Sequence, residues 1–313
     1  MIWIDVKDYN NGVKVKPHGI RLFLLTGVRW SVRSPWFFDM QIPAFTLTGI
    51  RRFHTFTIME TDFFKGIKQW AFFQADDREG KLPCFYYDTT SLTAIYTAAT
   101  REIRALLPRK EMYPLEVIPG RCLIAFTAFE YRKTDIDPYN EFAISFPISY
   151  NRPQIPSLTA AWQMAWRNIS AYVWQLPVTT EIARKGGVDM YGYPKFIADI
   201  TFEKRTDAIT CTLSENEETI LALTGKILPV RREKVTRFTT YSVIDGIPLK
   251  ANVLINPIQF AQSMAKTSAA IELGSHPIAR MLKTFELSRK PITYQYSPLN
   301  QGILFAGRNL IDD

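Results

Sequence analysis

Lys195 is the residue with the clearest chemical potential in this sequence of 313 residues. It ends the stretch Tyr191-Gly192-Tyr193-Pro194-Lys195, in which glycine and proline predict a sharp turn. Apolar and polar residues alternate from Phe196 to Phe202, as in a strand with one buried face. Lys195 therefore lies where a stiff backbone could direct its amine into a pocket. The alternative is a lysine at a strand edge that extends into solvent, as lysines usually do.

Glu141 is the second candidate, because it opens a strand that alternates in character. Phe142, Ile144, Phe146 and Ile148 share one face, and Glu141, Ala143, Ser145 and Pro147 share the other. A carboxylate in a row of small side chains suits the wall of a cavity. The alternative is a glutamate at a strand end in solvent, since glutamate is rarely buried.

Composition excludes several other kinds of site. The formal net charge is +8, but the basic residues are scattered and form no stripe with aromatic residues, which argues against a nucleic-acid groove. A mild attraction for small anions fits better. The three histidines are widely spaced, and no phosphate-binding loop or dinucleotide motif occurs, so we expect neither a metal nor an organic cofactor.

The cysteines and the apolar segments bear on location. Three cysteines without a CxxC spacing indicate a reducing compartment, and we expect a cytoplasmic protein without disulfides. The start of the chain lacks the basic region of a signal peptide. The apolar run from Ile20 to Val28 is too short to cross a bilayer, so no membrane association is expected.

Many short runs of β-branched and aromatic residues between turn signals predict a mainly β fold with a few short helices. The helices are expected at Ala98–Leu107, at Leu158–Asn168 after Ser157, at Glu181–Lys185 between Thr180 and Gly186, and from Ser275-His276-Pro277 to Leu287. His276 is interpreted as a residue that starts a helix, and Trp162 and Trp166 as core.

Residues 1–81 have poor periodicity. The charged cluster from Asp76 to Lys81 is typical of a linker. We therefore expect an N-terminal extension of unknown role over residues 1–81 and a domain over residues 82–313.

Three motifs follow one another along the chain. They are Pro138-Tyr139-Asn140-Glu141, the segment from Glu181 to Lys195 with its Gly-Tyr-Pro-Lys ending, and Gly274-Ser275-His276-Pro277-Ile278-Ala279. Together, in this order, they resemble the acetoacetate decarboxylase family. The resemblance covers roughly residues 82–308. It implies a mostly antiparallel, closed or conical β-barrel with the site inside, a homo-oligomer, and a small keto acid as the substrate.

In this family a lysine forms a Schiff base with the substrate, so the resemblance implies that role for Lys195. Glu141 would move protons or position the substrate. Tyr139, Tyr193, Phe126, Ala143 and Ser145 would line the pocket. An amine must be neutral to attack a ketone, and an ordinary lysine with a pKa of ~10.4 is neutral in only about one part in 2,500 at pH 7. Burial and a neighbouring cation disfavour the ammonium form, and acetoacetate decarboxylase is itself the known example of activation by a second cation.

The sequence departs from the family pattern in three places. In an ungapped alignment, Phe126 falls near the position of a second pocket carboxylate of the family. Phe196 stands where the decarboxylases have a second lysine, and Arg184-Lys185 is an alternative location for such a pair. The family's substrate-binding arginine falls near Thr89 or Ser91. Three functions stay open: decarboxylation of a β-keto acid, aldolase or dehydratase chemistry on a keto acid through the same intermediate, and binding of a small apolar ligand without catalysis.

Overall fold

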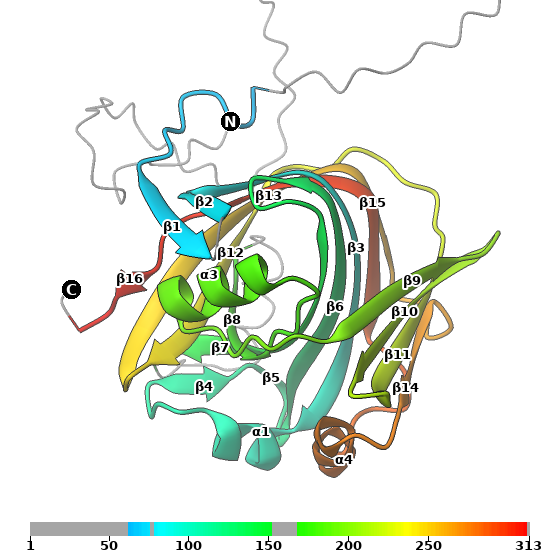
Figure 1. Ribbon diagram of the computed structural model, residues 1–313. Coiled ribbons are helices and arrows are strands. Elements are labelled where there is room, and N and C mark those ends of the chain that lie inside the picture. The colour runs from blue at the N-terminus through cyan, green and yellow to red at the C-terminus, as the bar shows by residue number, and fades with distance from the viewer. Residues whose placement is uncertain (1–61, 76–77, 152–167, 312–313) are drawn as a thin grey trace, which may run out of the picture. The chain divides into compact units, whose positions relative to one another are not determined.

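Seven strands close on themselves into a barrel in the computed structural model, which describes residues 62–75, 78–151 and 168–311 (Figure 1). All of these residues belong to one compact unit, Thr57–Asp313. Around the barrel the strands are β7 (Tyr139–Tyr150), β8 (Asn168–Gln175), β12 (Thr236–Ile244), β13 (Ile247–Ser263), β15 (Thr293–Leu304), β3 (Cys84–Ala99) and β6 (Arg121–Thr134). The pairing of β6 with β7 completes the ring, and β8–β12 is its one parallel pair among the described residues. The expected mainly β fold and closed barrel are confirmed.

A second, four-stranded sheet covers one side of the barrel. It has the order β14 (Ala269–Leu273), β11 (Glu218–Lys226), β10 (Ala208–Glu215) and β9 (Asp199–Lys204). The main hydrophobic core contains residues of both sheets, such as Phe142, Ile144 and Phe126 from the barrel with Cys211 and Leu223 from the smaller sheet. Three short strands extend the barrel sheet: β4 (Met112–Pro114), β5 (Glu116–Ile118) and β16 (Arg308–Asn309).

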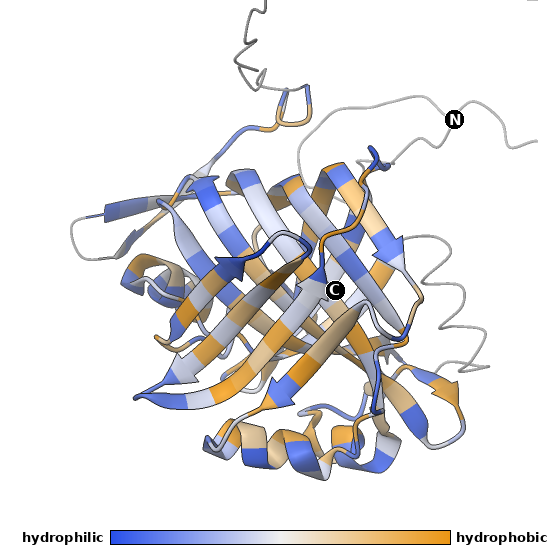
Figure 2. Ribbon diagram, turned by 90° about the vertical axis from the view of Figure 1, so that its right-hand side faces the viewer, coloured by the Kyte–Doolittle hydropathy of each residue, from blue (hydrophilic) through white to orange (hydrophobic). Residues whose placement is uncertain are grey.

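Strand β7 has the two faces that its sequence predicts. Phe142, Ile144, Phe146 and Ile148 are fully buried in the main core. Figure 2 shows the same alternation of hydrophobic and hydrophilic positions along strands of the barrel. The opposite face of β7 carries Glu141 and is therefore directed away from the core that packs on the smaller sheet.

The described helices are α1 (Thr100–Leu106), α3 (Glu181–Tyr191) and α4 (Pro277–Thr284). His276 starts α4, because its Nδ1 accepts a hydrogen bond from the Ile278 amide at 3.2 Å. Its Nε2 lies 3.0 Å from Oε2 of Glu215, so both ring nitrogens are used structurally. In the part of the chain that the structure describes, no helix is both long and apolar enough to cross a membrane.

Helix α3 is longer than the sequence predicts. It continues through Gly186 and Gly187 to Tyr191, and ends at Gly192, which has a φ of 60°. Thr180 stands at its N-cap but makes no capping hydrogen bond with its side chain. The helix lies inside the mouth of the barrel (Figure 1). The expected helix at 158–168, with Trp162 and Trp166, lies outside the described residues apart from its last residue, which begins β8.

The expected linker over residues 76–81 is wrong for its described part. Arg78–Leu82 form strand β2, which pairs with β1 (Ala71–Ala75) in an antiparallel hairpin. Gly80 allows this pairing, because a side chain there would overlap the ring of Phe73. The division of the chain at residue 81 stays a prediction.

Candidate active site

Lys195 and Glu141 form a buried ion pair. Nζ of Lys195 lies 2.7 Å from Oε2 of Glu141, and the two side chains are 7% and 9% exposed. The alternatives in which each side chain extends into solvent are therefore wrong. Because the two residues are 54 positions apart, it is the fold that brings them together.

Backbone contacts fix both residues. Val178 forms β-bridges with Glu141 on one side and with Ile197 on the other. The amide of Val178 also donates to the carbonyl of Phe196 at 2.9 Å. Lys195 thus stands in an extended segment that precedes β9. The segment that contains Val178 lies between it and β7. The backbone positions of Lys195 and Glu141 are therefore held in a fixed arrangement relative to each other.

Two glycines inside α3 make room for the site. A Cβ atom at Gly187 would lie 2.4 Å from Cδ and Cε of Lys195. A Cβ atom at Gly186 would lie 2.5 Å from the ring of Phe73. The lysine stem and the Phe73 ring therefore lie directly against the helix backbone, which explains why α3 tolerates two consecutive glycines despite their low helix propensity.

Three tyrosines surround the carboxylate. The hydroxyl of Tyr131 donates to Oε1 of Glu141 at 3.3 Å, and that of Tyr139 donates to the Tyr86 hydroxyl at 3.4 Å. The ring of Tyr131 lies 4.6 Å from that of Tyr86 and 4.7 Å from that of Tyr139. Nζ of Lys195 lies 5.7 Å from the centre of the Tyr139 ring, which is within the range of a cation–π contact.

Burial raises the pKa of Tyr86, Tyr131 and Tyr139 well above the ordinary value, and the negative charge of Glu141 adds to the rise. Burial likewise raises the pKa of the Cys84 thiol to about 12. These groups stay protonated at neutral pH, so they are available as neutral hydrogen-bond donors.

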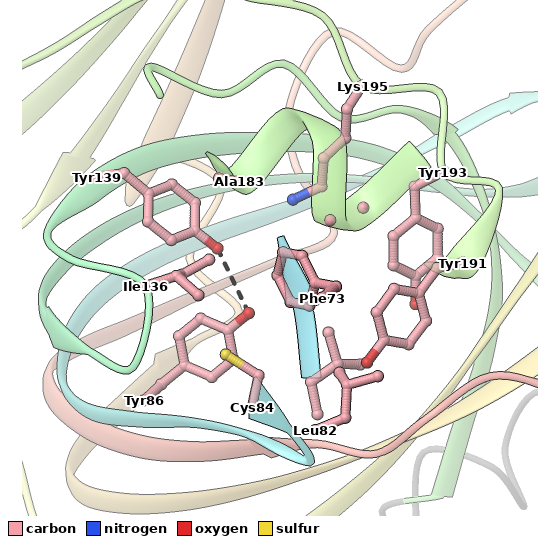
Figure 3. A pocket seen from close by; sticks show the side chains of 13 residues that line it. Phe73, Leu82, Cys84, Tyr86, Ile136, Tyr139, Ala183, Tyr191, Tyr193 and Lys195 are labelled. Atoms are coloured by element: carbon pink, nitrogen blue, oxygen red, sulfur yellow. Dashed lines mark hydrogen bonds between the residues drawn. The ribbon is translucent and has the colours of Figure 1, made fainter. Parts of the chain in front are cut away.

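A small cavity opens beside the Lys195 amine (Figure 3). Aromatic and aliphatic side chains make up most of its wall, and Lys195 is the one charged residue among the described residues that line it. The lining residues are Phe73, Leu82, Cys84, Tyr86, Ile136, Tyr139, Ala183, Gly186, Gly187, Tyr191, Tyr193, Lys195 and Leu304. No cluster of three or more His, Cys, Asp or Glu side chains that could hold a metal ion occurs among the residues described.

The structure brings together part of the expected pocket. Tyr139, Tyr193 and Lys195 line the cavity, and Glu141 is bonded to Lys195. Ala143 packs against the cluster that contains Tyr193, and Ser145 lies farther along β7, opposite Val173. Neither Ala143 nor Ser145 lines the cavity.

Phe126 is not part of the pocket. It is fully buried in the main core, where its ring lies 5.8 Å from that of Tyr96, on the face of the barrel that packs on the smaller sheet. The register of β6 and β7 places Phe129 opposite Glu141. Phe126 is three positions away and so faces the other side, a direction that an ungapped alignment does not reveal.

Arg184 and Lys185, the alternative location for a second cation, do not line the cavity either. Lys185 pairs with Asp189 at 2.9 Å, and Arg184 pairs with Glu181 on the exposed side of α3. Phe196, at the position of the second lysine, packs against the main core.

Sequence reasoning missed Tyr131, Tyr86, Tyr191 and Phe73. One signal could have found Tyr131: the hairpin that joins β6 and β7 places it opposite Tyr139, two positions from Glu141 on the same face. Phe73 was hidden because its segment was assigned to the N-terminal extension.

A model of the family described as acetoacetate decarboxylase (ADC) matches residues 72–293. The chain belongs to the acetoacetate decarboxylase family. The match begins inside β1 and so includes Phe73 and strand β2. No functionally curated protein matches the chain by sequence.

Solved structures of the family have the same fold. Acetoacetate decarboxylase from Legionella pneumophila superposes with a TM-score of 0.55 at 13% identity, over 86% of this chain and 98% of that one. A second acetoacetate decarboxylase gives 0.52 at 15% identity, over 73% and 89%. The enduracididine biosynthesis enzyme MppR, in complex with the condensation product of pyruvate and imidazole 4-carboxaldehyde, gives 0.52 at 11% identity, over 73% and 90%.

Proposed function

We propose that this member of the acetoacetate decarboxylase family is a lyase that decarboxylates a β-keto acid through a Schiff base on Lys195. The observation that carries the proposal is the Lys195 amine, buried beside a cavity and paired with a carboxylate that can take its proton. An amine in this setting is suited to nucleophilic catalysis on a carbonyl compound.

The reaction would begin with transfer of a proton from Lys195 to Glu141. The neutral amine attacks the carbonyl carbon of the substrate, and loss of water gives a protonated imine. The bond between the α-carbon and the carboxylate then breaks, and its electron pair moves into the imine as carbon dioxide leaves. Protonation of the resulting enamine on carbon and hydrolysis of the imine release the ketone and restore the amine.

The surroundings of the pair support two parts of this sequence. Tyr131 donates to Oε1 of Glu141, so Oε2 is the oxygen that faces the Lys195 amine and would receive its proton. The apolar wall disfavours a substrate carboxylate more than neutral carbon dioxide, so it favours the bond cleavage.

A second candidate is aldol or dehydration chemistry on a keto acid through the same imine. One observation favours it: the structural neighbour MppR is recorded with the condensation product of pyruvate and imidazole 4-carboxaldehyde. Both functions start with the same covalent intermediate on Lys195.

The protein is further proposed to be a homo-oligomer that works in the cytoplasm. The buried free thiols of Cys84, Cys122 and Cys211 are compatible with a reducing compartment, and the family resemblance supports assembly. Light scattering coupled to size-exclusion chromatography would test the oligomer, and a mass equal to that of the monomer would refute it.

The function is tested by borohydride trapping with a panel of β-keto and α-keto acids, followed by peptide mapping. We expect a reduced adduct on Lys195 in the wild type and none in Lys195→Ala. Lys185→Ala is the matched control, because this lysine is exposed on α3 and paired with Asp189. Its adduct should equal that of the wild type.

Gas release on the same panel separates the two chemistries. Carbon dioxide from a β-keto acid supports the decarboxylase, and an adduct without carbon dioxide supports aldol or dehydration chemistry. No adduct with any keto acid would refute both and favour a non-catalytic binder of apolar ligands.

A further inference from the structure

Tyr191 carries an unused hydroxyl in the wall of the cavity. The residue is 3% exposed, and its hydroxyl has no hydrogen-bond partner among the described residues. Tyr191 is one of the residues that line the cavity, and Figure 3 shows its hydroxyl beside the side chain of Leu82. A buried hydroxyl without a partner is unfavourable, so such a group in a binding cavity points to a ligand atom that completes it.

The fold holds this hydroxyl in one place. Tyr191 is the last residue of α3, and its carbonyl oxygen accepts a hydrogen bond from Oγ of Ser242. Its ring stacks on that of Tyr193, with centroids 5.1 Å apart and planes 5° apart. A donor fixed in this way loses little freedom when a ligand binds.

The neighbouring hydroxyls already have partners. Tyr193 pairs with Oγ1 of Thr240 at 2.6 Å, Tyr139 with Tyr86, and Tyr131 with Glu141. Within this tyrosine group, Tyr191 is therefore the one whose hydroxyl has no hydrogen-bond partner among the described residues.

We propose that Tyr191 recognises the substrate by donating a hydrogen bond to an uncharged oxygen at the end remote from the reacting carbonyl. The substrate would then be a keto acid whose apolar body carries a hydroxyl, ether or second carbonyl oxygen. That it is a keto acid rests on the proposed function. That it carries a remote oxygen rests on Tyr191.

The surroundings of Tyr191 select an uncharged group. It packs with Leu82, Leu304 and Phe73. A carboxylate at this place would lose its hydration without gaining a cation, because Lys195 is the only charged lining residue described and is paired with Glu141. Burial raises the pKa of Tyr191 well above its ordinary value, so the phenol keeps the proton that it donates.

The test compares ligands that differ by one hydroxyl. Isothermal titration calorimetry would measure 2-oxopentanoate against 5-hydroxy-2-oxopentanoate, and phenylpyruvate against 4-hydroxyphenylpyruvate. The two pairs place the extra oxygen at different distances from the carbonyl. We expect the wild type to bind the hydroxylated member of at least one pair roughly fivefold to tenfold more tightly, and Tyr191→Phe to lose that preference.

Tyr294→Phe is the matched control. The Tyr294 hydroxyl is also buried without a described partner, but it lies in the main core and does not line the cavity. Its removal should leave the preference unchanged, so a general effect of losing a buried hydroxyl is separated from recognition. Equal preference in the wild type and Tyr191→Phe, or no preference in either pair, would overturn the proposal.

Borohydride trapping of the same ligands separates this inference from the proposed function. A preference that depends on Tyr191, with no adduct on Lys195 from these ligands or from any β-keto acid of the panel, would refute the Schiff-base function and retain the role of Tyr191. An adduct on Lys195, with the same ligand preference in the wild type and in Tyr191→Phe, would support the Schiff-base function and refute the role of Tyr191.

Discussion

The Lys195–Glu141 pair makes the site sensitive to the loss of either partner, because each would leave the other charge buried alone. We expect Lys195→Met and Glu141→Gln each to lower the free energy of unfolding by about 3–5 kcal/mol. The double variant Lys195→Met/Glu141→Gln should be closer to the wild type than the sum of the two losses. Urea denaturation of the four proteins gives the coupling energy directly.

The exposed pair of Lys185 with Asp189 provides the control for this cycle. Its side chains are 42% and 50% exposed, so Lys185→Met should change stability by no more than about 0.5 kcal/mol. Additive losses in the Lys195–Glu141 cycle would mean that the two charges do not interact in the folded protein.

At the residue scale, local sequence pattern singled out the two residues of the buried ion pair. Glu141 stood out from the small residues on its face of β7, and Lys195 from the turn before it. Phe126 was chosen by counting along an ungapped alignment, and the count is off because cross-strand register decides which residues share a face with Glu141. Tyr131 and Tyr86 could not be found from either strand alone.

At the scale of elements, the absence of a side chain at Gly187 lets the Lys195 side chain pack directly against the backbone of α3. We expect Gly187→Ala to reduce the rate of borohydride trapping at least about tenfold, because the new Cβ would occupy the position of the lysine stem. Stability should change little, since alanine gains about 1 kcal/mol of helix propensity that offsets part of the overlap. Trapping rates and urea midpoints measured on the same samples would separate the two effects.

Gly302→Ala controls for a glycine substitution elsewhere in the barrel. The nearest atoms to a Cβ at Gly302 lie 3.5 Å away, in Tyr86, which is ordinary contact. Trapping by Gly302→Ala should equal that of the wild type. Unimpaired trapping by Gly187→Ala would show that Lys195 does not need to lie against α3.

The same glycines explain where element prediction failed. The sequence placed the end of the helix at Gly186 because glycine is a common C-terminal signal. The true end is Gly192, where a positive φ requires glycine. Gly186 and Gly187 are instead set by contacts with Phe73 and Lys195, and such tertiary contacts leave no local signature. Helices α1 and α4 begin within two residues of the predicted positions, and they end at Leu106 and Thr284, close to the predicted ends at Leu107 and Leu287.

At the scale of the whole molecule, closure of the barrel could not be derived from periodicity. Alternation predicts strands and their buried faces, but not that β7 pairs with both β6 and β8, or that β8 and β12 run parallel. The family resemblance predicted that the barrel is closed, but not which strands pair. The charged cluster from Asp76 to Lys81 was the reason for placing the start of the domain at residue 82, whereas Phe73, from the hairpin at this point of the chain, forms part of the cavity wall.

Because several tyrosines and thiols are buried in this unit, its free energy of unfolding should depend on pH in the alkaline range. Tyr86, Tyr131 and Tyr139 have pKa values raised well above 10 in the folded protein, chiefly by burial. The Cys84 pKa is raised to about 12 and that of Cys122 to about 11. Above the ordinary pKa values the unfolded chain releases protons that the folded protein retains. The free energy of unfolding should therefore fall as pH rises, from about pH 9 for the thiols and about pH 10 for the tyrosines.

Urea denaturation at pH 8, 9, 10, 10.5 and 11 would measure this fall. Each raised tyrosine contributes up to about 1.4 kcal/mol per pH unit above pH 10. Tyr131→Phe removes one such group, so its slope between pH 10 and 11 should be shallower than that of the wild type by up to this amount, whatever its stability at pH 8. A slope equal to that of the wild type would mean that Tyr131 titrates in the folded protein as it does in the unfolded chain, and that the carboxylate of Glu141 is not enclosed by protonated phenols.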